Sequence, residues 1–298
     1  MNPLVERLHG LFLPITTPFK EDMAVDYEAL QCNMAAYAET DIHGYLALGS
    51  NGENRCLSED EKQQVLKTIC QSRRPDQIVM AGCVYDSTVL AVDFINMAQE
   101  AGADYATLLA PSYYRKFMTH EVLVEYFSEC ADAAAIPVLL YNAPGFTGIA
   151  LEPRTVAELA EHPNILGMKD SAASGIENFC PSMSGEFAVL AGSAGFLYPA
   201  MVHYHVPGGI ISLANAFPSA GLTLLDYAQQ GGSEAGDRFH DTMKTVNKRI
   251  SGAYGVPGVK AAMDLAGLRG GYPRKPLKRL NEEARADIKQ ALEEADLL

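Results

Sequence analysis

The chain is organised around the stretch Asn164-Ile165-Leu166-Gly167-Met168-Lys169-Asp170-Ser171, a short apolar run that ends in a lysine. The run predicts a buried strand, and an ammonium group at the inner end of such a strand is costly unless it has a partner. Asp170 is the next residue, but successive side chains on a strand point to opposite faces, so it is poorly placed to pair with Lys169. Lys169 is therefore either a strand-end lysine that reaches solvent or an amine kept neutral so that it can act as a nucleophile.

Similar apolar runs recur along the chain, and each is followed by a helical pattern. The runs cover residues 10–16, 44–48, 78–82, 104–109, 136–141, 164–171, 187–191 and 209–213. The helical patterns cover about 26–39, 58–70, 86–100, 119–134, 152–161, 175–183 and 195–205, with a last one that ends near residue 230. The spacing of roughly 25 to 35 residues suits a strand–helix unit, and continuous apolar strands are typical of a parallel sheet that is buried on both faces. Eight such units predict an α/β fold, a (β/α)8 TIM barrel over residues 1–225.

An open, doubly wound parallel sheet is the alternative architecture. Such a sheet normally carries a glycine-rich first turn that binds a nucleotide. The first turn here is Thr16-Thr17-Pro18-Phe19, and no G-x-G-x-x-G motif follows any of the predicted strands. The barrel is therefore the preferred prediction.

The residues after the barrel contain helical patterns only. Gly231-Gly232-Ser233 marks a break, and the helices predicted beyond it cover about 234–250, 258–266 and 281–297. We predict that residues 226–298 form a C-terminal helical domain, appended to the barrel. The basic residues between 269 and 279 are predicted to be a solvated connector.

Composition and charge exclude several classes of protein. The chain has 298 residues and a formal net charge of −14, which argues against nucleic-acid binding and against docking on anionic membranes. No apolar run approaches the roughly 20 residues that span a bilayer, and the first ten residues contain no apolar segment typical of a secretory signal. The six cysteines are scattered and form no C-x-x-C pair, as in proteins that keep their thiols reduced. We expect a cytoplasmic protein.

Active sites of (β/α)8 barrels lie at the C-terminal ends of the strands. The residues expected there include a lysine, several hydroxyl groups, and glycines whose backbone a ligand can approach closely. They are Ser50, Asn51 and Gly52 after the second strand, Tyr113, Tyr114 and Arg115 after the fourth, Tyr141 and Asn142 on the fifth, Lys169 and Ser171 on the sixth, Gly192 and Ser193 after the seventh, and Ile211 and Ser212 on the eighth. The sequence shows no set of metal ligands, no pair of strand-end carboxylates and no G-x-S-x-G motif, so we expect no metal and no hydrolase of those kinds.

A lysine that forms a Schiff base fits this set of residues. A neutral Lys169 amine can attack the keto group of a small 2-oxo acid and form an imine, which serves as an electron sink while a neighbouring carbon–carbon bond breaks or forms. Tyr141 ends the adjacent strand and can carry protons, with Ser50 as its partner. Singly, Tyr141 can also be a core tyrosine, and Ser50 and Asn51 ordinary turn residues. The expected cofactor is none, because the covalent imine on Lys169 takes its place.

The motifs at these positions resemble those of the dihydrodipicolinate synthase / N-acetylneuraminate lyase superfamily of class I pyruvate aldolases, and the resemblance covers nearly the whole chain. The motifs are Gly49-Ser50-Asn51-Gly52-Glu53, Ala110-Pro111-Ser112-Tyr113-Tyr114, Tyr141-Asn142-Ala143-Pro144, Gly167-Met168-Lys169-Asp170-Ser171, Leu190-Ala191-Gly192-Ser193 and Gly255-Val256-Pro257-Gly258-Val259-Lys260. The resemblance implies that Lys169 forms the imine and that Tyr141 shuttles protons. It implies a hydroxyl relay completed by Ser50 and by Tyr114 of a neighbouring subunit, in a homotetramer built as a dimer of dimers. The predicted substrate-binding residues are Ser50, Asn51, Gly52, Ser171, Gly192 and Ile211.

One position separates the branches of this superfamily. The resemblance implies that the synthase of lysine biosynthesis carries an arginine for the semialdehyde carboxylate where this chain has Phe146, and a phenyl ring cannot form that ion pair. The motifs around Ser50, Lys169 and Gly192 are more similar to those of 4-hydroxy-2-oxoglutarate aldolases. We therefore predict a lyase that cleaves a 4-hydroxy-2-oxo acid to pyruvate and an aldehyde. The alternatives are 4-hydroxy-tetrahydrodipicolinate synthase and a catalytically silent regulator that binds keto acids. Phe146 and Arg115 are the predicted specificity residues, and Ser171 is a candidate partner for the second carboxylate or the 4-hydroxyl.

Overall fold

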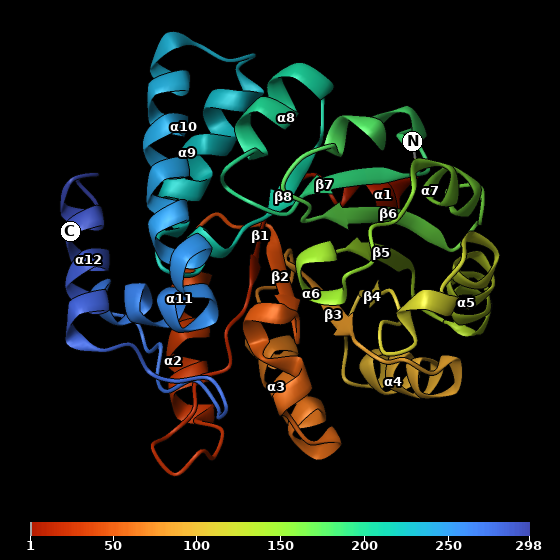
Figure 1. The fold of residues 1–298 in the computed structure, drawn as a ribbon, viewed down its shortest axis with the longest axis horizontal. Helices are drawn as coiled ribbons and strands as arrows, with labels where there is room; N and C mark the ends of the chain where they lie inside the picture. Colours follow the sequence, from red (N-terminus) through yellow and green to blue (C-terminus); the bar gives the residue numbers. More distant parts are fainter. Residues whose placement is uncertain (1) are drawn as a thin grey trace.

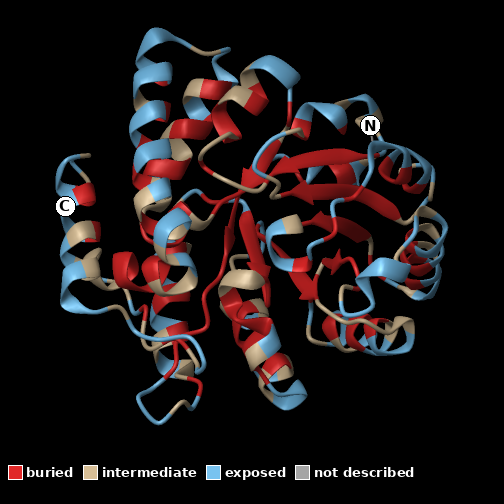
Figure 2. Ribbon diagram, viewed as in Figure 1, coloured by how far each residue is buried: buried red, intermediate tan, exposed pale blue. Residues whose placement is uncertain are grey.

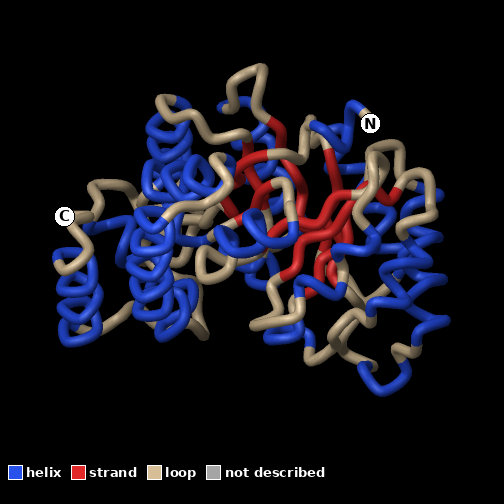
Figure 3. Tube along the Cα trace, turned by 90° about the horizontal axis from the view of Figure 1, so that it is seen from above, coloured by secondary structure: helices blue, strands red, loops and turns tan. Residues whose placement is uncertain are grey.

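The computed structural model describes residues 2–298, and its sheet is a closed barrel of parallel strands in the order β1 to β8. The strands are β1 (Gly10–Pro14), β2 (Gly44–Ala47), β3 (Ile78–Cys83), β4 (Tyr105–Leu109), β5 (Val138–Asn142), β6 (Ile165–Asp170), β7 (Ala188–Ala191) and β8 (Gly208–Ile210). The barrel closes where β8 pairs with β1. The prediction of a (β/α)8 barrel is confirmed, and Figure 1 and Figure 3 show the strands enclosed by helices.

Helices cover the outside of the barrel. They are α2 (Tyr27–Ala38), α3 (Glu59–Ser72), α4 (Thr88–Glu100), α5 (His120–Ala133), α7 (Pro153–Leu159), α8 (Leu197–Tyr204) and α9 (Pro218–Gln229). Two short helices lie at the ends of the barrel: α1 (Pro3–Glu6) before β1 and α6 (Pro144–Thr147) directly after β5. Single 3-10 turns follow several strands: η1 (Ser50–Gly52), η2 (Asn54–Cys56), η3 (Arg115–Phe117), η4 (Ile176–Asn178), η5 (Cys180–Ser182) and η6 (Ser212–Asn215).

The strands are buried along their whole length (Figure 2), as continuous apolar runs predict. Side chains inside the barrel, such as Phe12 and Leu139, form one cluster with Val5 and Leu8 from the N-terminal segment. The Tyr105 hydroxyl, at the start of β4, donates to a carbonyl of this segment at 2.7 Å. The N-terminal segment therefore packs against the end of the barrel where the strands begin, and the opposite end is left to the loops that follow them.

Local capping explains where the outer helices begin. Asp26 accepts a hydrogen bond from the Ala29 N–H at the start of α2, at 3.0 Å. Ser58 and Glu61 form the predicted capping box of α3, in which each side chain accepts from the other residue's N–H.

The helix predicted over residues 175–183 is wrong. The structure has two 3-10 turns there, η4 and η5. Gly175 is in the left-handed conformation, with a φ of 98°, and a proline opens the second turn. Proline has no N–H to donate, so the segment cannot continue as a regular helix.

The eighth strand is shorter than predicted, because it ends at Ile210 and not at residue 213. Asn215 donates to the Pro14 carbonyl at 2.9 Å and to the Ser212 carbonyl at 3.2 Å, which holds the chain in the turn η6. Ile211 and Ser212 therefore follow the strand instead of lying in it.

The C-terminal part of the chain is helical, as predicted. It contains α10 (Glu234–Asn247), the π-helical turn η7 (Lys248–Gly252), α11 (Ala253–Leu265) and α12 (Glu282–Glu293). α10 lies beside α9, and α12 packs against α11 at the outer edge of the molecule (Figure 1). The predicted boundary between residues 225 and 226 falls inside α9, whereas Gly231 and Gly232 form the turn that separates α9 from α10. The division into two domains stays a prediction. None of the helices within residues 2–298 has the length and apolar character that crossing a membrane requires.

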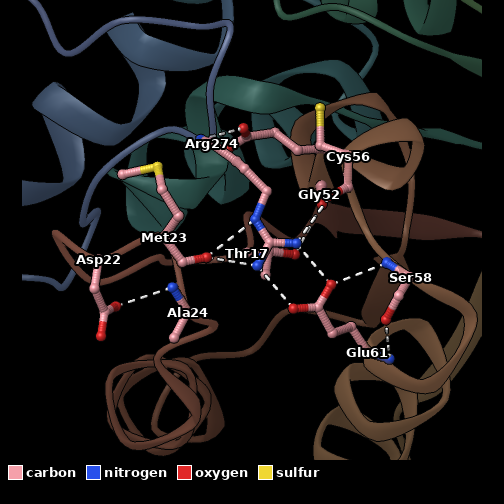
Figure 4. A network of polar contacts seen from close by, with 10 residues as sticks. Thr17, Asp22, Met23, Ala24, Gly52, Cys56, Ser58, Glu61 and Arg274 are labelled. Carbon is pink, nitrogen blue, oxygen red and sulfur yellow. Dashed lines mark hydrogen bonds and ion pairs between the residues drawn. The ribbon is translucent and has the colours of Figure 1, made fainter.

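The connector after α11 is not simply solvated, because Arg274 is tied to the barrel. Its guanidinium forms two hydrogen bonds to the Glu61 carboxylate, at 2.6 and 2.7 Å. It also donates to the carbonyls of Met23 and Cys56 (Figure 4). The connector therefore joins α3 and the loop after β2 to the C-terminal helices.

Candidate active site

The turn that follows β2 presents Ser50 and Asn51 and is tightly held. Leu48 and Glu53, at its two ends, are left-handed, with φ of 56° and 53°. Such backbone strain persists only where the surroundings enforce it. Here the Asn54 amide donates to the Leu48 carbonyl at 2.9 Å, and the Gly52 carbonyl accepts from Thr17 at 2.8 Å (Figure 4). The turn is therefore a rigid support for ligand contacts.

Lys169, Tyr141 and Ser50 lie together at the C-terminal end of the barrel. Tyr141 and Lys169 are register partners on β5 and β6, so their side chains point to the same face. The Lys169 Nζ lies 4.7 Å from the centre of the Tyr141 ring. The Tyr141 hydroxyl lies 3.4 Å from the Ser50 Oγ. Lys169 is buried, with 4% of its surface exposed, so it is not a strand-end lysine that reaches solvent.

The surroundings of Tyr141 favour loss of its proton. Burial raises the pKa of the Tyr141 phenol, but the charge of Lys169 and hydrogen bonds with Ser50, Ser171 and Lys169 together leave that pKa below its ordinary value. A phenol with a lowered pKa exchanges protons more readily near neutral pH. Tyr141 is thus suited to carry protons between an amine on one side and a hydroxyl on the other.

Asp170 points away from Lys169, as the alternation along a strand predicts. Its carboxylate accepts from the Asn142 amide at 2.7 Å and from the Ala172 N–H at 3.2 Å. Burial raises the pKa of this carboxyl group. Asp170 therefore fixes the ends of β5 and β6 relative to each other.

The other predicted substrate-binding residues surround this group. The Asn51 amide donates to the Ser212 Oγ at 2.6 Å. The backbone N–H groups of Gly52, Gly192 and Ile211 already donate to the carbonyls of Gly49, Asp170 and Phe12, at 3.0, 2.7 and 3.2 Å. The first of these bonds closes the turn after β2, and the other two join neighbouring strand ends. All three N–H groups are thus already paired, and a substrate contact by these residues stays a prediction.

Glycine at position 192 also makes room for Ser171. A Cβ at Gly192 would collide with the Ser171 Oγ and with the Asp170 carbonyl. Ser171 in turn is held by its N–H, which donates to the Asn142 carbonyl at 2.8 Å. The close approach of the two strand ends therefore requires glycine.

The predicted specificity and relay residues lie further out. Tyr114 is 62% exposed, and its ring packs edge-on against Tyr113 at 5.0 Å between centres. Phe146, on α6, is 70% exposed. The Arg115 guanidinium lies against Gly148, at the end of α6, where it would meet any added Cβ. None of these three is placed in contact with Lys169 within the described chain, residues 2–298.

A cavity of about 530 Å³ opens beside Ser50. Its walls come from the ends of β2 to β5 and from the C-terminal part of the chain. They are formed by Ser50, Glu53, Asn54, Arg55, Cys56, Val84, Tyr85, Asp86, Leu109, Ala110, Ser112, Phe146, Thr147, Tyr254, Gly255, Val256, Pro257, Pro276 and Leu277. Lys169 and Tyr141 do not line the cavity themselves. Ser50 does, and because its Oγ lies 3.4 Å from the Tyr141 hydroxyl, it connects the cavity to these two side chains. The sequence analysis found Phe146 but missed Arg55 and Asp86, which stand outside the recognised motifs.

A buried ion pair behind the turn was also missed. The Lys260 Nζ lies 2.5 Å from the Glu53 carboxylate, and the exposed fractions of the two residues are 1% and 4%. Lys260 also donates to the carbonyls of Thr17 and Tyr272, both at 2.7 Å. Burial lowers the pKa of Lys260 to about 8, although the Glu53 carboxylate opposes that shift. The pair joins α11 to the turn that carries Ser50.

Comparison with known proteins adds to this geometry. The chain matches the sequence model of the Dihydrodipicolinate synthetase family over residues 7–295. The chain belongs to this family. The superfamily resemblance is confirmed, and membership makes the protein an enzyme of the class I pyruvate-dependent aldolase kind.

Curated and solved members of the family are similar over nearly their whole length. A protein of Geobacter sulfurreducens is 34% identical over 97% of this chain and 99% of its own, and one of Haloarcula marismortui is 32% identical over 97% and 95%. Both are named 4-hydroxy-tetrahydrodipicolinate synthase. The crystal structure of the chloride-inhibited dihydrodipicolinate synthase from Acinetobacter baumannii, complexed with pyruvate, is 28% identical, with a TM-score of 0.91, and covers 98% of this chain and 100% of that one. These names favour the synthase alternative over the aldolase branch that the sequence predicted.

Proposed function

We propose that this enzyme joins pyruvate to an aldehyde, or releases it again, through an imine on Lys169. The observation that carries the proposal is the placement of the buried Lys169 beside Tyr141, whose hydroxyl lies 3.4 Å from Ser50. Metal ligands are not part of this chemistry, because the imine supplies the electron sink.

The steps follow from the three side chains. Lys169 first gives its proton to Tyr141, and the neutral amine then attacks C2 of pyruvate. Tyr141 returns a proton to the resulting hydroxyl, which leaves as water. The imine then loses a proton from C3 and becomes an enamine. The enamine carbon attacks the aldehyde carbonyl, the new carbon–carbon bond forms, and the alkoxide takes up a proton. Water finally hydrolyses the imine, and cleavage runs through the same steps in reverse.

For the aldehyde, the relatives support aspartate semialdehyde, so that the reaction is that of 4-hydroxy-tetrahydrodipicolinate synthase. The sequence predicted this reaction only as an alternative, and the names of the relatives make it the first candidate here. Cleavage of 4-hydroxy-2-oxoglutarate to pyruvate and glyoxylate is the second candidate, and Phe146 favours it because a phenyl ring lines the cavity where the resemblance implies an arginine.

Two assays test the proposal. Borohydride reduction in the presence of pyruvate is expected to fix a three-carbon adduct on Lys169, located by peptide mass spectrometry. Consumption of aspartate semialdehyde with pyruvate, and pyruvate release from 4-hydroxy-2-oxoglutarate coupled to lactate dehydrogenase, then separate the two candidates. An adduct without turnover in either assay would indicate the silent regulator, and an unmodified Lys169 would exclude the Schiff-base chemistry.

Removal of the Tyr141 hydroxyl is expected to slow the enzyme without unfolding it. Tyr141→Phe keeps the ring against Lys169 but deletes the proton carrier, so kcat should fall by about 10²- to 10⁴-fold. The pyruvate adduct should still accumulate on long incubation. Tyr105→Phe is the matched control, because its hydroxyl bonds a carbonyl at the opposite end of the barrel. A Tyr141→Phe enzyme with wild-type kcat would contradict the assigned role.

Phe146→Arg is expected to favour aspartate semialdehyde. A guanidinium at this position in the cavity wall can pair with the carboxylate, and we expect kcat/KM for the semialdehyde to rise by about tenfold. The ratio of synthase to cleavage activity should rise with it. Leu90→Arg places the same group at an exposed position on α4, outside the cavity lining, and should change neither rate. No change in the ratio on Phe146→Arg would show that a side chain at position 146 does not reach the carboxylate.

The family resemblance also supports a homotetramer with Tyr114 lent across an interface. The exposure of Tyr113, Tyr114 and Phe117 is what such an interface needs. Sedimentation equilibrium measures the assembly directly, and a monomer with full activity would exclude a relay through a neighbouring subunit.

A further inference from the structure

The cavity beside Ser50 contains one basic side chain. Of the residues that line it, all within the described part of the chain, Arg55 is the only lysine or arginine. It follows the turn that carries Ser50 and belongs to η2. Arg55 is therefore the positively charged lining residue that an anion in the cavity would meet.

The guanidinium of Arg55 is oriented but not saturated. It donates to the Val84 carbonyl at 3.2 Å and to the Asp86 carboxylate at 3.4 Å. Both contacts are long for a charged hydrogen bond. A guanidinium has five N–H donors, and 61% of this side chain is exposed, so donors remain for a ligand.

The acidic residues of the cavity do not cancel this charge. The Glu53 carboxylate is occupied by Lys260 and by the Arg274 N–H, which donates to it at 2.8 Å. Asp86 accepts the N–H groups of Ser112 and Tyr113, at 2.6 and 3.1 Å, through the oxygen that does not face Arg55. The second oxygen of Asp86 is thus the weak partner that a stronger carboxylate contact can replace.

The other candidate cation is outside the cavity. Arg115 lies against Gly148, at the end of α6, and is not among the lining residues. Phe146, which lines the cavity, carries no charge. Of the two predicted specificity residues, Phe146 therefore shares the cavity with Arg55 without offering a charge, and Arg115 does not line it.

We propose that Arg55 binds the carboxylate of the aldehyde-derived half of the substrate, so that the accepted class is an aldehyde that also bears a carboxylate. The inference rests on the proposed function, because it needs pyruvate to be held on Lys169. It applies to either candidate reaction, since aspartate semialdehyde and glyoxylate both carry this group. A planar guanidinium suits the role because its paired N–H donors match the two carboxylate oxygens.

Arg55→Gln tests the proposal, with Arg55→Lys as the conservative variant and Arg154→Gln, at an exposed arginine on α7 outside the cavity lining, as the matched control. The substrate is whichever of aspartate semialdehyde and glyoxylate the wild-type enzyme accepts. Loss of a charged hydrogen bond is expected to raise the KM for that aldehyde by about 10- to 100-fold in Arg55→Gln. The rate at which pyruvate is trapped by borohydride should be unchanged, Arg55→Lys should recover part of the loss, and Arg154→Gln should match the wild type.

Several outcomes would overturn the proposal. They are an unchanged aldehyde KM in Arg55→Gln, an equal loss in the trapping of pyruvate, and a wild-type enzyme that forms the adduct but accepts neither carboxylate-bearing aldehyde. Failure of the proposed function looks different, because the wild-type enzyme would then form no adduct with pyruvate at all.

Discussion

Lys169→Met is expected to abolish both the pyruvate adduct and turnover, with kcat reduced by about 10³-fold or more because the nucleophile itself is lost. Methionine keeps most of the length and apolar volume of lysine. Because the substitution also removes a buried ammonium group, the free energy of unfolding should stay unchanged or rise. Borohydride trapping with peptide mass spectrometry measures the adduct, and urea unfolding measures the stability.

Other buried lysines are already paired with carboxylates, which makes the assignment of Lys169 as the nucleophile specific. Lys260 is also buried, but its ammonium group is committed to Glu53 and to the carbonyls of Thr17 and Tyr272. Lys62 is 5% exposed and paired with Glu59 at 2.8 Å. Lys62→Met is therefore the control, and it should keep both the adduct and the turnover. A pyruvate adduct on Lys260, or activity in Lys169→Met, would show that the wrong amine has been assigned.

The sequence predicts the placement of Lys169, Tyr141 and Ser50 well, because the barrel is a regular repeat. Once strands five and six are recognised, the parallel register puts Tyr141 beside Lys169. Their strand-end positions, together with the turn after strand two, then put Ser50 at the same end of the barrel. The side chains of capping residues such as Asp26 and Ser58 likewise accept backbone N–H groups only a few residues further along the chain. The starts of α2 and α3 are therefore predictable from the sequence.

Two elements were predicted wrongly, the helix over residues 175–183 and the end of the eighth strand, and each has a local cause. Residues 175–183 have helical composition, but one left-handed glycine and one proline inside the segment override it. The eighth strand ends early because Asn215 bonds carbonyls at Pro14 and Ser212, a contact made from outside the apolar run.

Contacts between distant parts of the chain were the least predictable. Arg274 was expected in solvent, yet its guanidinium forms two hydrogen bonds to Glu61. Arg55 lies outside the recognised motifs, and only the structure shows that it lines the cavity beside Ser50. A sequence pattern reports backbone preference and the buried face of an element, but not which charged side chains from separate elements meet. For the same reason, Phe146 alone was a weak basis for choosing the branch, and the relatives favour the other one.

The ion pair between Glu53 and Lys260 is expected to be the most sensitive point of the fold. Lys260→Met leaves a buried carboxylate, and Glu53→Gln leaves a buried ammonium group. We expect each single change to lower the free energy of unfolding by about 3–5 kcal/mol, because the remaining charge has lost its partner in a site of low dielectric. The double variant removes both charges, so its loss should be smaller than the sum of the two single losses by at least about 1 kcal/mol.

Urea unfolding of the four proteins in this cycle measures the coupling. The matched control is the exposed pair Lys289 and Glu293 on α12, whose charged atoms lie 3.5 Å apart with side chains 58% and 54% exposed. The same substitutions there should change stability by less than about 1 kcal/mol, because solvent already screens the charges. Equal effects at both pairs would mean that burial does not govern the Glu53–Lys260 interaction.

The same variants connect the ion pair to function. Glu53 ends the turn that holds Ser50, and Lys260 ties that end to the carbonyl of Thr17, whose hydroxyl donates to Gly52. Loss of the pair should loosen the turn even where the barrel stays folded. We therefore expect the single variants, assayed at a temperature where they remain folded, to trap pyruvate more slowly than the wild type, and the double variant to stay slow even though its stability partly returns. That separation would identify Glu53 and Lys260 as positioning residues, since a purely structural pair would recover trapping and stability together.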